Sequence, residues 1–141
     1  MHHGARHACI TPGARNSPLT YAFSKEKGIS CYSHVDERSS AFFALGLAKS
    51  TKNPVVVIAT SGTAAANFYP AVIEASLSCI PLIILSADRP HHLVGTGANQ
   101  TISQEKLYGS HVRYFNDVGQ PAENFNPLEK ILQESINHLT G

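Results

Sequence analysis

The acidic pair Asp36-Glu37 is the part of this sequence best suited to proton-transfer chemistry. Both acids stand where a strongly apolar helix is expected to begin, and a helix start needs only one of them as a cap. We assign the capping role to Asp36 and treat Glu37 as the candidate functional acid. An acid in the first turn also stabilises a helix by roughly 0.3–1 kcal/mol through the helix dipole, so the pattern alone leaves both roles open for Glu37.

Two arginines are candidates for binding an anionic substrate. Arg15 and Arg89 have few acidic neighbours in the sequence, and a guanidinium binds a carboxylate through two parallel N–H bonds. For Arg89 there is an alternative, an ion pair with Asp88 inside a turn that Pro90 stabilises. The sequence leaves these two interpretations of Arg89 equally open.

A turn of small residues, Ser61-Gly62-Thr63, is expected at the start of another helix. Free backbone N–H groups at a helix start bind anions or polar groups, although a plain tight turn explains the pattern equally well. The chain has neither the Gly-Lys-Ser/Thr of a Walker loop nor the Gly-x-Ser-x-Gly of a nucleophile elbow. On pattern alone, Asn99 and Gln100 are ordinary polar residues of a long loop.

Apolar segments alternate with helical patterns along the chain, and this order predicts an α/β fold. We expect a three-layer α/β/α, doubly wound parallel sheet in one domain, residues 1–141. Polar clusters follow four of the expected strands, and ligands bind beyond the carboxyl ends of parallel strands, so one shared site is expected there. The expected strands are His7–Ile10, Ile29–Ser33, Val55–Ala59, Pro81–Ser86 and, more weakly, Val112–Phe115.

Four helices are expected. The first covers residues 17–27, the second runs from its cap at Asp36 to a break at Asn53-Pro54, and the others cover residues 63–78 and 127–139. The third is expected to be interrupted at Pro70. A short helical turn is expected near 104–108. Gly28 is expected to stop the first helix. The second helix is expected to bury a broad apolar face made of Phe42, Phe43, Leu45, Leu47 and Ala48.

The composition argues against several classes of function. The formal net charge of the 141 residues is +1, with lysines and arginines scattered singly, whereas a nucleic-acid surface normally needs a basic stripe. No apolar run approaches the ~20 residues that span a bilayer, and the start lacks the apolar core of a signal peptide. We expect a cytoplasmic protein with no nucleic-acid partner, no membrane insertion and no metal ligand of its own. Its cysteines, expected to be three reduced core thiols, are Cys9, Cys31 and Cys79.

Five stretches have the residue types, order and spacing of a known enzyme family. They are TPGARNSPLT (11–20), HVDERSSAFFALGLAK (34–49), TSGTAAANFYPAVIEA (60–75), SADRP (86–90) and GANQTI (97–102). Together they resemble the 2-succinyl-5-enolpyruvyl-6-hydroxy-3-cyclohexene-1-carboxylate synthases of menaquinone biosynthesis, over a region from about Gly4 to Gly109. The resemblance implies that the chain is the pyrimidine-binding domain of a thiamine-diphosphate enzyme.

The resemblance also implies a role for each candidate residue. Glu37 would hydrogen-bond a ring nitrogen of the aminopyrimidine of thiamine diphosphate and so favour the imino tautomer that removes the thiazolium proton. 2-Oxoglutarate would then be decarboxylated, and the resulting succinyl-semialdehyde carbanion would add to isochorismate in a carboligase (transferase) reaction. The implied substrate-binding residues are Arg15, Arg89, Asn99 and Gln100, and the implied cofactor-binding residues are Glu37, Ser61, Gly62 and Thr63.

Some parts that the resemblance implies are missing from this sequence. The family's second half binds Mg²⁺ and the cofactor diphosphate through a Gly-Asp-Gly…Asn-Asn motif, and nothing here resembles that motif. The family's active site also forms between the subunits of a homodimer or homotetramer. We therefore expect residues 1–141 to be truncated at both ends and inactive alone. Ala14 stands where the family commonly has a serine, so no side-chain hydrogen bond is available there.

Two other functions stay open. Another thiamine-diphosphate decarboxylase or carboligase, such as acetolactate synthase, would share the strand, glutamate and helix arrangement. Such enzymes usually have a Gly-Pro-Gly type turn in place of Ser61-Gly62-Thr63, and they lack the Ala-Asp-Arg-Pro segment. A non-catalytic doubly wound binding module would share the fold alone, because fold does not determine function.

Overall fold

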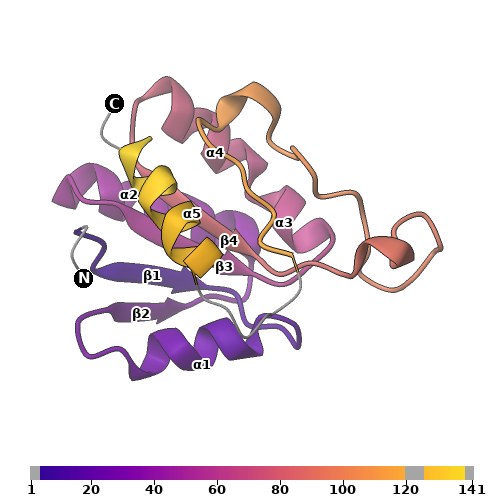
Figure 1. The fold of residues 1–141 in the computed structure, drawn as a ribbon. Coiled ribbons are helices and arrows are strands. Elements are labelled where there is room, and N and C mark those ends of the chain that lie inside the picture. Colours follow the sequence, from indigo (N-terminus) through magenta and orange to yellow (C-terminus); the bar gives the residue numbers. More distant parts are fainter. Residues whose placement is uncertain (1–3, 120–125, 139–141) are drawn as a thin grey trace.

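A four-stranded parallel sheet forms the centre of the molecule (Figure 1). The computed structural model describes residues 4–119 and 126–138. The interior strand β3 has all five side chains buried, because its β-branched and apolar residues face two covered sides of the sheet. The sheet order is β2-β1-β3-β4, formed by β1 (His7–Ile10), β2 (Ser30–Ser33), β3 (Val55–Ala59) and β4 (Leu82–Ser86).

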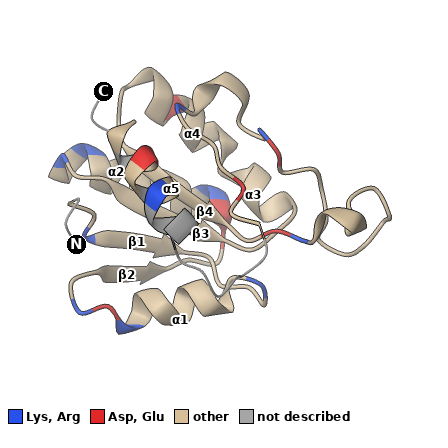
Figure 2. Ribbon diagram, in the orientation of Figure 1, with Lys and Arg blue, Asp and Glu red and all other residues tan. Residues whose placement is uncertain are grey.

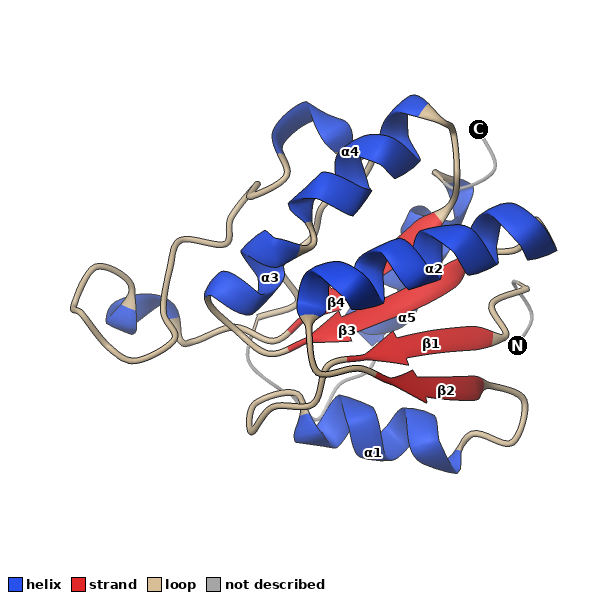
Figure 3. Ribbon diagram, turned by 180° about the vertical axis from the view of Figure 1, so that it is seen from behind, coloured by secondary structure: helices blue, strands red, loops and turns tan. Residues whose placement is uncertain are grey.

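Helices cover both faces of this sheet. Seen from opposite sides in Figures 1 and 3, α2, α3 and α4 lie on one face, and α1 and α5 lie on the other. This arrangement confirms the predicted three-layer α/β/α fold. The helices are α1 (Ser17–Lys25), α2 (Glu37–Thr51), α3 (Thr63–Asn67), α4 (Tyr69–Leu77) and α5 (Asn126–Asn137).

The predicted break near Pro70 is present. Helix α3 ends at Asn67, and α4 begins at Tyr69 with Pro70 in its first turn, where a proline needs no N–H partner. The first helix was predicted two residues too long. It ends at Lys25 rather than at Lys27, because Glu26 takes an extended conformation and donates its N–H to the Phe23 carbonyl at 3.2 Å.

The predicted strand Val112–Phe115 is wrong. Val112 has an extended conformation, but the segment joins no strand ladder of the described sheet. Side chains hold this segment instead, since the Tyr114 hydroxyl donates to the Glu134 carboxylate of α5 at 3.0 Å and Val112 packs against the core. A short 3₁₀ helix, Gly109–His111, precedes it, next to the turn predicted near 104–108.

The buried face of α2 is also different from the prediction. Ser40, Ala41, Ala44 and Ala48 are its buried residues, whereas the Phe42 and Phe43 side chains are 40% and 42% exposed. Small side chains let the helix lie close against β1 and β3, and the larger rings are displaced to its flanks. The Phe43 ring lies beside β2, where its centroid is 5.3 Å from that of Tyr32 and 5.0 Å from that of His34.

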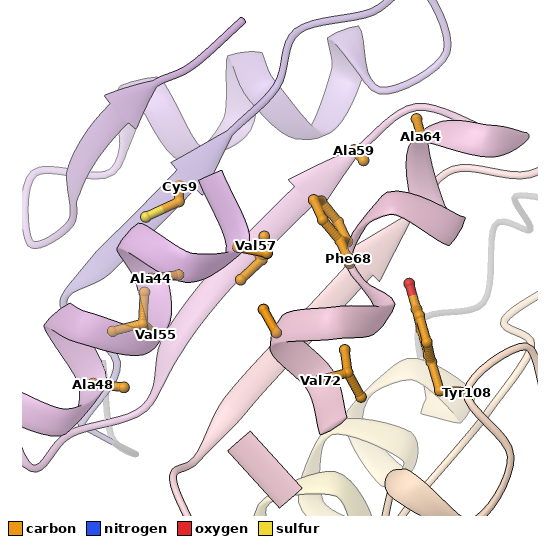
Figure 4. Packing of buried hydrophobic residues seen from close by; sticks show 12 residues of the cluster. Cys9, Ala44, Ala48, Val55, Val57, Ala59, Ala64, Phe68, Val72 and Tyr108 are labelled. Atoms are coloured by element: carbon orange, nitrogen blue, oxygen red, sulfur yellow. The ribbon is translucent and has the colours of Figure 1, made fainter. Parts of the chain in front are cut away.

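Each face of the sheet has its own apolar cluster. On the side of α2, α3 and α4, Phe68 and Val57 pack in one cluster with Tyr108 (Figure 4). On the side of α1, Ile58 packs with Phe23. Lysine and arginine positions are scattered along the ribbon and form no continuous basic run in this view (Figure 2). Within the described residues, no helix has the length and hydropathy needed to cross a bilayer.

The prediction of three core thiols holds only for Cys9. All three cysteines are free of disulfides, but Cys31 and Cys79 are exposed, because β2 is an edge strand and Cys79 lies in the turn after α4. Burial raises the pKa of the Cys9 thiol to about 12. Since thiolates are the reactive form, Cys9 is chemically protected in the folded chain.

We therefore expect a thiol reagent at neutral pH to modify two cysteines of the native chain quickly and the third only after unfolding. Absorbance with an aromatic disulfide reagent, before and after addition of denaturant, measures this. Cys31→Ser is the matched control and should remove one fast equivalent without changing the slow one. Three fast equivalents in the native state would contradict the burial of Cys9.

Candidate functional site

All four strands end at the same edge of the sheet, because every pair of neighbours is parallel. The polar clusters predicted from the sequence follow these four strand ends and therefore lie along one rim. The chain adds β2 on one side of β1 and then returns to add β3 on the other side. The rim between β1 and β3 is thus a topological switch point, where doubly wound sheets bind their ligands.

Arg15 lies at the centre of the contacts along this rim. Its Nη1 donates to Gln100 Oε1 at 3.2 Å and to Ser61 Oγ at 3.4 Å. Ser61 Oγ in turn donates to the Gln100 carbonyl at 2.8 Å. The structure therefore brings together three of the predicted site residues, which come from the ends of β1 and β3 and from the long loop.

Arg89 joins the same group from the end of β4. Its Nε and Nη2 donate to the Asn99 carbonyl at 3.2 and 3.0 Å. The alternative ion pair with Asp88 is absent from residues 4–119 and 126–138, and the Asp88 carboxylate instead accepts the Arg89 backbone N–H at 2.7 Å. The guanidinium thus secures the loop that carries Asn99 and Gln100.

Gly62 lies directly against the backbone of Gln100. It has φ +82° and ψ −141°, a conformation open essentially to glycine only. A Cβ at this position would lie 2.9 Å from the carbonyl carbon of Gln100. A free N–H for a ligand is one interpretation of this turn in the sequence. In the structure the Gly62 N–H is not free, because it donates to Gln104 Oε1 at 2.7 Å. Of the predicted turn, Thr63 is the residue that is exposed.

Asp36 and Glu37 take the places predicted for them at the start of α2. Asp36 is the cap, with its Oδ1 accepting the Ser39 N–H at 2.7 Å, and this hydrogen bond lowers the pKa of Asp36. Glu37 is half-buried, and among the described residues its carboxylate has no hydrogen-bond or ion-pair partner. That carboxylate is therefore available to a group from outside the described residues.

Among the described residues, Glu37 has no hydrogen bond or ion pair with the other candidates. It follows β2 at one end of the sheet, whereas Arg89 follows β4 at the opposite end. No hydrogen bond joins Glu37 to Arg15, Arg89 or the loop. The rim thus has two parts: a free acid beside β2, and an arginine-containing group beside β1, β3 and β4.

Two buried polar residues shape the rim without having been predicted. Asn16 is fully buried, donates from Nδ2 to the Thr11 carbonyl at 2.9 Å and accepts the Gly13 N–H at 2.7 Å. It thereby sets the turn that carries Arg15. Its position before Ser17-Pro18 resembles an ordinary helix cap in the sequence, and Gln104 gives no signal beyond being a polar loop residue.

Across the described residues, no three His, Cys, Asp or Glu side chains are grouped to hold a metal ion.

Comparison with known proteins identifies relatives of this chain. Residues 1–107 match the family model described as thiamine pyrophosphate enzyme, N-terminal TPP binding domain. The chain is 49% identical over 141 residues to 2-succinyl-5-enolpyruvyl-6-hydroxy-3-cyclohexene-1-carboxylate synthase of Halobacterium salinarum, covering 98% of this chain and 24% of that protein. The synthase of the same name from Dechloromonas aromatica is 56% identical over 139 residues, covering 97% of this chain and 26% of the relative. That from Lysinibacillus sphaericus is 57% identical over 114 residues, which are 81% and 20% of the two chains. This chain thus spans about a quarter of the length of these curated relatives.

Proposed function

We propose a function for this chain on the ground that it belongs to the thiamine pyrophosphate enzymes, of which it forms the N-terminal TPP binding domain. The domain serves a thiamine-diphosphate-dependent synthase that decarboxylates 2-oxoglutarate and joins the remaining four-carbon unit to isochorismate in menaquinone biosynthesis. The names of the relatives support this reaction. The relatives, which are 49–57% identical to this chain, are named as synthases of 2-succinyl-5-enolpyruvyl-6-hydroxy-3-cyclohexene-1-carboxylate. The observation that carries the proposal is the Glu37 carboxylate, half-buried at the ligand-binding rim with no partner among the described residues.

Glu37 suits the cofactor because its carboxylate, which has no partner among the described residues, can share a proton with a ring nitrogen. When bound, thiamine diphosphate supplies the electron sink that carbon–carbon bond cleavage and formation need. Glu37 holds a proton at a nitrogen of the aminopyrimidine and so sets its protonation state. Helix α2 orients this side chain, and Asp36 fixes the first turn of that helix through Ser39.

The arginines suit anionic substrates because no acid of the described residues forms an ion pair with them. Within the described part of the chain, the Arg15 guanidinium donates only to neutral oxygens of Ser61 and Gln100, and the Arg89 guanidinium donates only to the Asn99 carbonyl. A guanidinium with unused N–H groups binds a carboxylate strongly. We assign Arg15, Arg89, Asn99 and Gln100 to the carboxylates of 2-oxoglutarate and isochorismate. We assign the turn of Ser61, Gly62 and Thr63 to the cofactor side of the site, with Thr63 as its exposed residue.

The remaining parts of the site come from outside residues 1–141 in this proposal. The relatives are about four times as long as this chain, which leaves room for a domain that binds Mg²⁺ and the cofactor diphosphate. Glu37 has no partner among the described residues of its own chain. An active site shared between two subunits of a homo-oligomer fits this geometry. The cysteines, none of which forms a disulfide, suit a cytoplasmic enzyme.

The experiment that tests this function uses the longer protein that carries this domain. With thiamine diphosphate and Mg²⁺, the longer protein should consume 2-oxoglutarate efficiently only when isochorismate is also present. Mass spectrometry should then find the coupled product. Pyruvate in place of 2-oxoglutarate is the control for acetolactate synthase or pyruvate decarboxylase activity. Turnover of pyruvate with none of 2-oxoglutarate would contradict the proposal, and no turnover of either would favour a non-catalytic module.

Replacing Arg89 with alanine is expected to raise the KM for the carboxylate substrates by about 10- to 100-fold, since a charge-assisted hydrogen bond contributes about 1.5–3 kcal/mol. The fold should persist, because Arg89 is only half-buried and the described hydrogen bonds of its side chain all go to one loop carbonyl. Steady-state kinetics of the longer protein measure this. Arg89→Lys keeps the charge but loses the forked geometry, so its KM should lie between those of the wild type and of Arg89→Ala. A normal KM combined with unfolding would assign Arg89 a purely structural role.

Residues 1–141 alone are expected to show no turnover and no tight cofactor binding. One aminopyrimidine contact from Glu37 is too small an interaction to hold a charged diphosphate ligand. Titration calorimetry of the chain with thiamine diphosphate and Mg²⁺ measures this directly. Micromolar affinity would show that the residues described above already hold most of the cofactor.

A further inference from the structure

Gln104 connects two strand ends of the rim through one side chain. It lies in the long loop after β4 and is only 8% exposed. Its Oε1 accepts the Gly62 N–H at 2.7 Å, after β3, and its Nε2 donates to the Ala87 carbonyl at 3.0 Å, after β4. Nε2 also lies 3.4 Å from Ser86 Oγ. A single amide therefore satisfies backbone groups that follow two neighbouring strands.

The chemistry of these contacts requires an amide. One backbone group is a donor and the other an acceptor, and among side chains of this length only glutamine offers an acceptor oxygen and an N–H donor together. The contact with Gly62 is buried and the contact with Ala87 is part-buried, so loss of the side chain leaves the buried Gly62 N–H without its partner and removes the donor to the Ala87 carbonyl. The position of the turn after β3 thus depends on Gln104.

That turn carries part of the arginine-containing group. Ser61, next to Gly62, accepts from Arg15 and donates to the Gln100 carbonyl. The Gly62 backbone also lies directly against Gln100, where a Cβ would be only 2.9 Å from the Gln100 carbonyl carbon. A displacement of Gly62 therefore moves Ser61 and Gln100, and with them the two side chains that fix the Arg15 guanidinium.

We infer that Gln104 is a positioning residue for the carboxylate substrate: it holds the turn after β3 so that Arg15 and Gln100 keep the spacing that binds the substrate. It does not touch the substrate itself. This role deepens the proposed function and depends on it for its kinetic consequence. The contact between Gln104 and Gly62 is independent of any reaction.

Tyr108 provides a matched comparison. It comes from the same loop, is buried, and donates its hydroxyl to the Ala65 carbonyl of α3 at 2.7 Å. It therefore also anchors α3 by one hydrogen bond to the backbone, but it contacts neither Ser61 nor Arg15 in the described contacts. Loss of its hydroxyl should weaken α3 without changing the arginine-containing group.

The test compares Gln104→Met and Tyr108→Phe in the longer synthase. Methionine keeps the length of the side chain and removes both strong hydrogen bonds. We expect both variants to melt at lower temperature, but only Gln104→Met should raise the KM for 2-oxoglutarate, by about tenfold, with kcat nearly unchanged. Hydrogen exchange of the peptide containing Gly62 should become about tenfold faster in Gln104→Met and stay unchanged in Tyr108→Phe.

Gln104→Glu separates the two contacts and serves if the methionine variant does not fold. It keeps an oxygen to accept the Gly62 N–H, so exchange at Gly62 should remain slow and the KM should stay within about threefold of the wild-type value. An unchanged KM in Gln104→Met, or equal KM increases in Gln104→Met and Tyr108→Phe, would overturn the positioning role. Unchanged exchange at Gly62 would overturn the contact itself. If the wild-type protein does not turn over 2-oxoglutarate, the proposed function fails instead, while the exchange comparison still decides whether Gln104 holds the turn.

Discussion

Replacing Glu37 with glutamine is expected to lower the turnover of the synthase by about 100-fold or more, because general acid–base catalysis typically contributes 10²–10⁴-fold. Glutamine has nearly the same shape but cannot share a proton with a ring nitrogen. The fold should be unaffected, since the Glu37 carboxylate has no partner among the described residues that the substitution could remove. Turnover at saturating cofactor and substrates, together with circular dichroism, measures both parts.

The neighbouring acid supplies the control for this result. Asp36→Ala removes the same charge one residue earlier and breaks the cap on Ser39, so it should lower stability and leave most of the turnover. The cap lowers the pKa of Asp36. Its contribution is therefore complete above the pKa of an unfolded aspartate and is lost as the pH falls through the lower pKa of the folded form. Near-normal turnover in Glu37→Gln, or an equal loss in Asp36→Ala, would remove Glu37 from the chemistry.

Gly62→Ala is expected to destabilise the chain by about 3 kcal/mol and to abolish substrate binding at the arginine-containing group. Backbone strain at a glycine-only conformation costs about 1–3 kcal/mol, and overpacking against a fixed backbone adds about 1–3 kcal/mol. The new Cβ would meet the Gln100 backbone at 2.9 Å and push the long loop away from Ser61. Urea unfolding measures the free energy, and the KM for 2-oxoglutarate measures the binding.

Gly97→Ala is the control that separates strain from collision. Gly97 also has a positive φ, +77°, but an added Cβ would meet nothing within 4 Å. The Gly97→Ala variant should therefore be destabilised only by the backbone strain and should keep its substrate affinity. If Gly62→Ala proves as stable as the wild type, or no worse than Gly97→Ala, the close contact between Gly62 and Gln100 is not an essential part of the site.

Much of the fold follows from local patterns in the sequence. The β-branched run Val55–Ala59 predicts a doubly covered strand, and the sheet buries all five of its side chains. Parallel strands place their carboxyl ends together, so the rim could be predicted once the strands were known. Val112–Phe115 shows the limit of the pattern, because its sequence suits a strand while side-chain bonds such as that from Tyr114 to Glu134 hold it outside the described sheet.

The contacts that complete the site depend on the tertiary structure. Gln104 meets Gly62 across 42 positions of the chain, and Arg15 meets Gln100 across 85. No local pattern distinguishes Gln100 and Gln104 from other polar loop residues. The two phenylalanines of α2 show the same dependence, because the close approach of Ala44 and Ala48 to the sheet decides which side of the helix is buried.

The most direct measurement of the role of Glu37 is the rate at which the C2 proton of thiamine diphosphate, bound to the longer protein, exchanges with solvent deuterium. Quenched-flow NMR of the wild type and of Glu37→Gln reports proton transfer at the cofactor without any substrate. We predict exchange at least about 100-fold slower in the glutamine variant, with cofactor still bound. Equal exchange rates in the two proteins would contradict the assignment of Glu37 as the acid that controls the cofactor's proton.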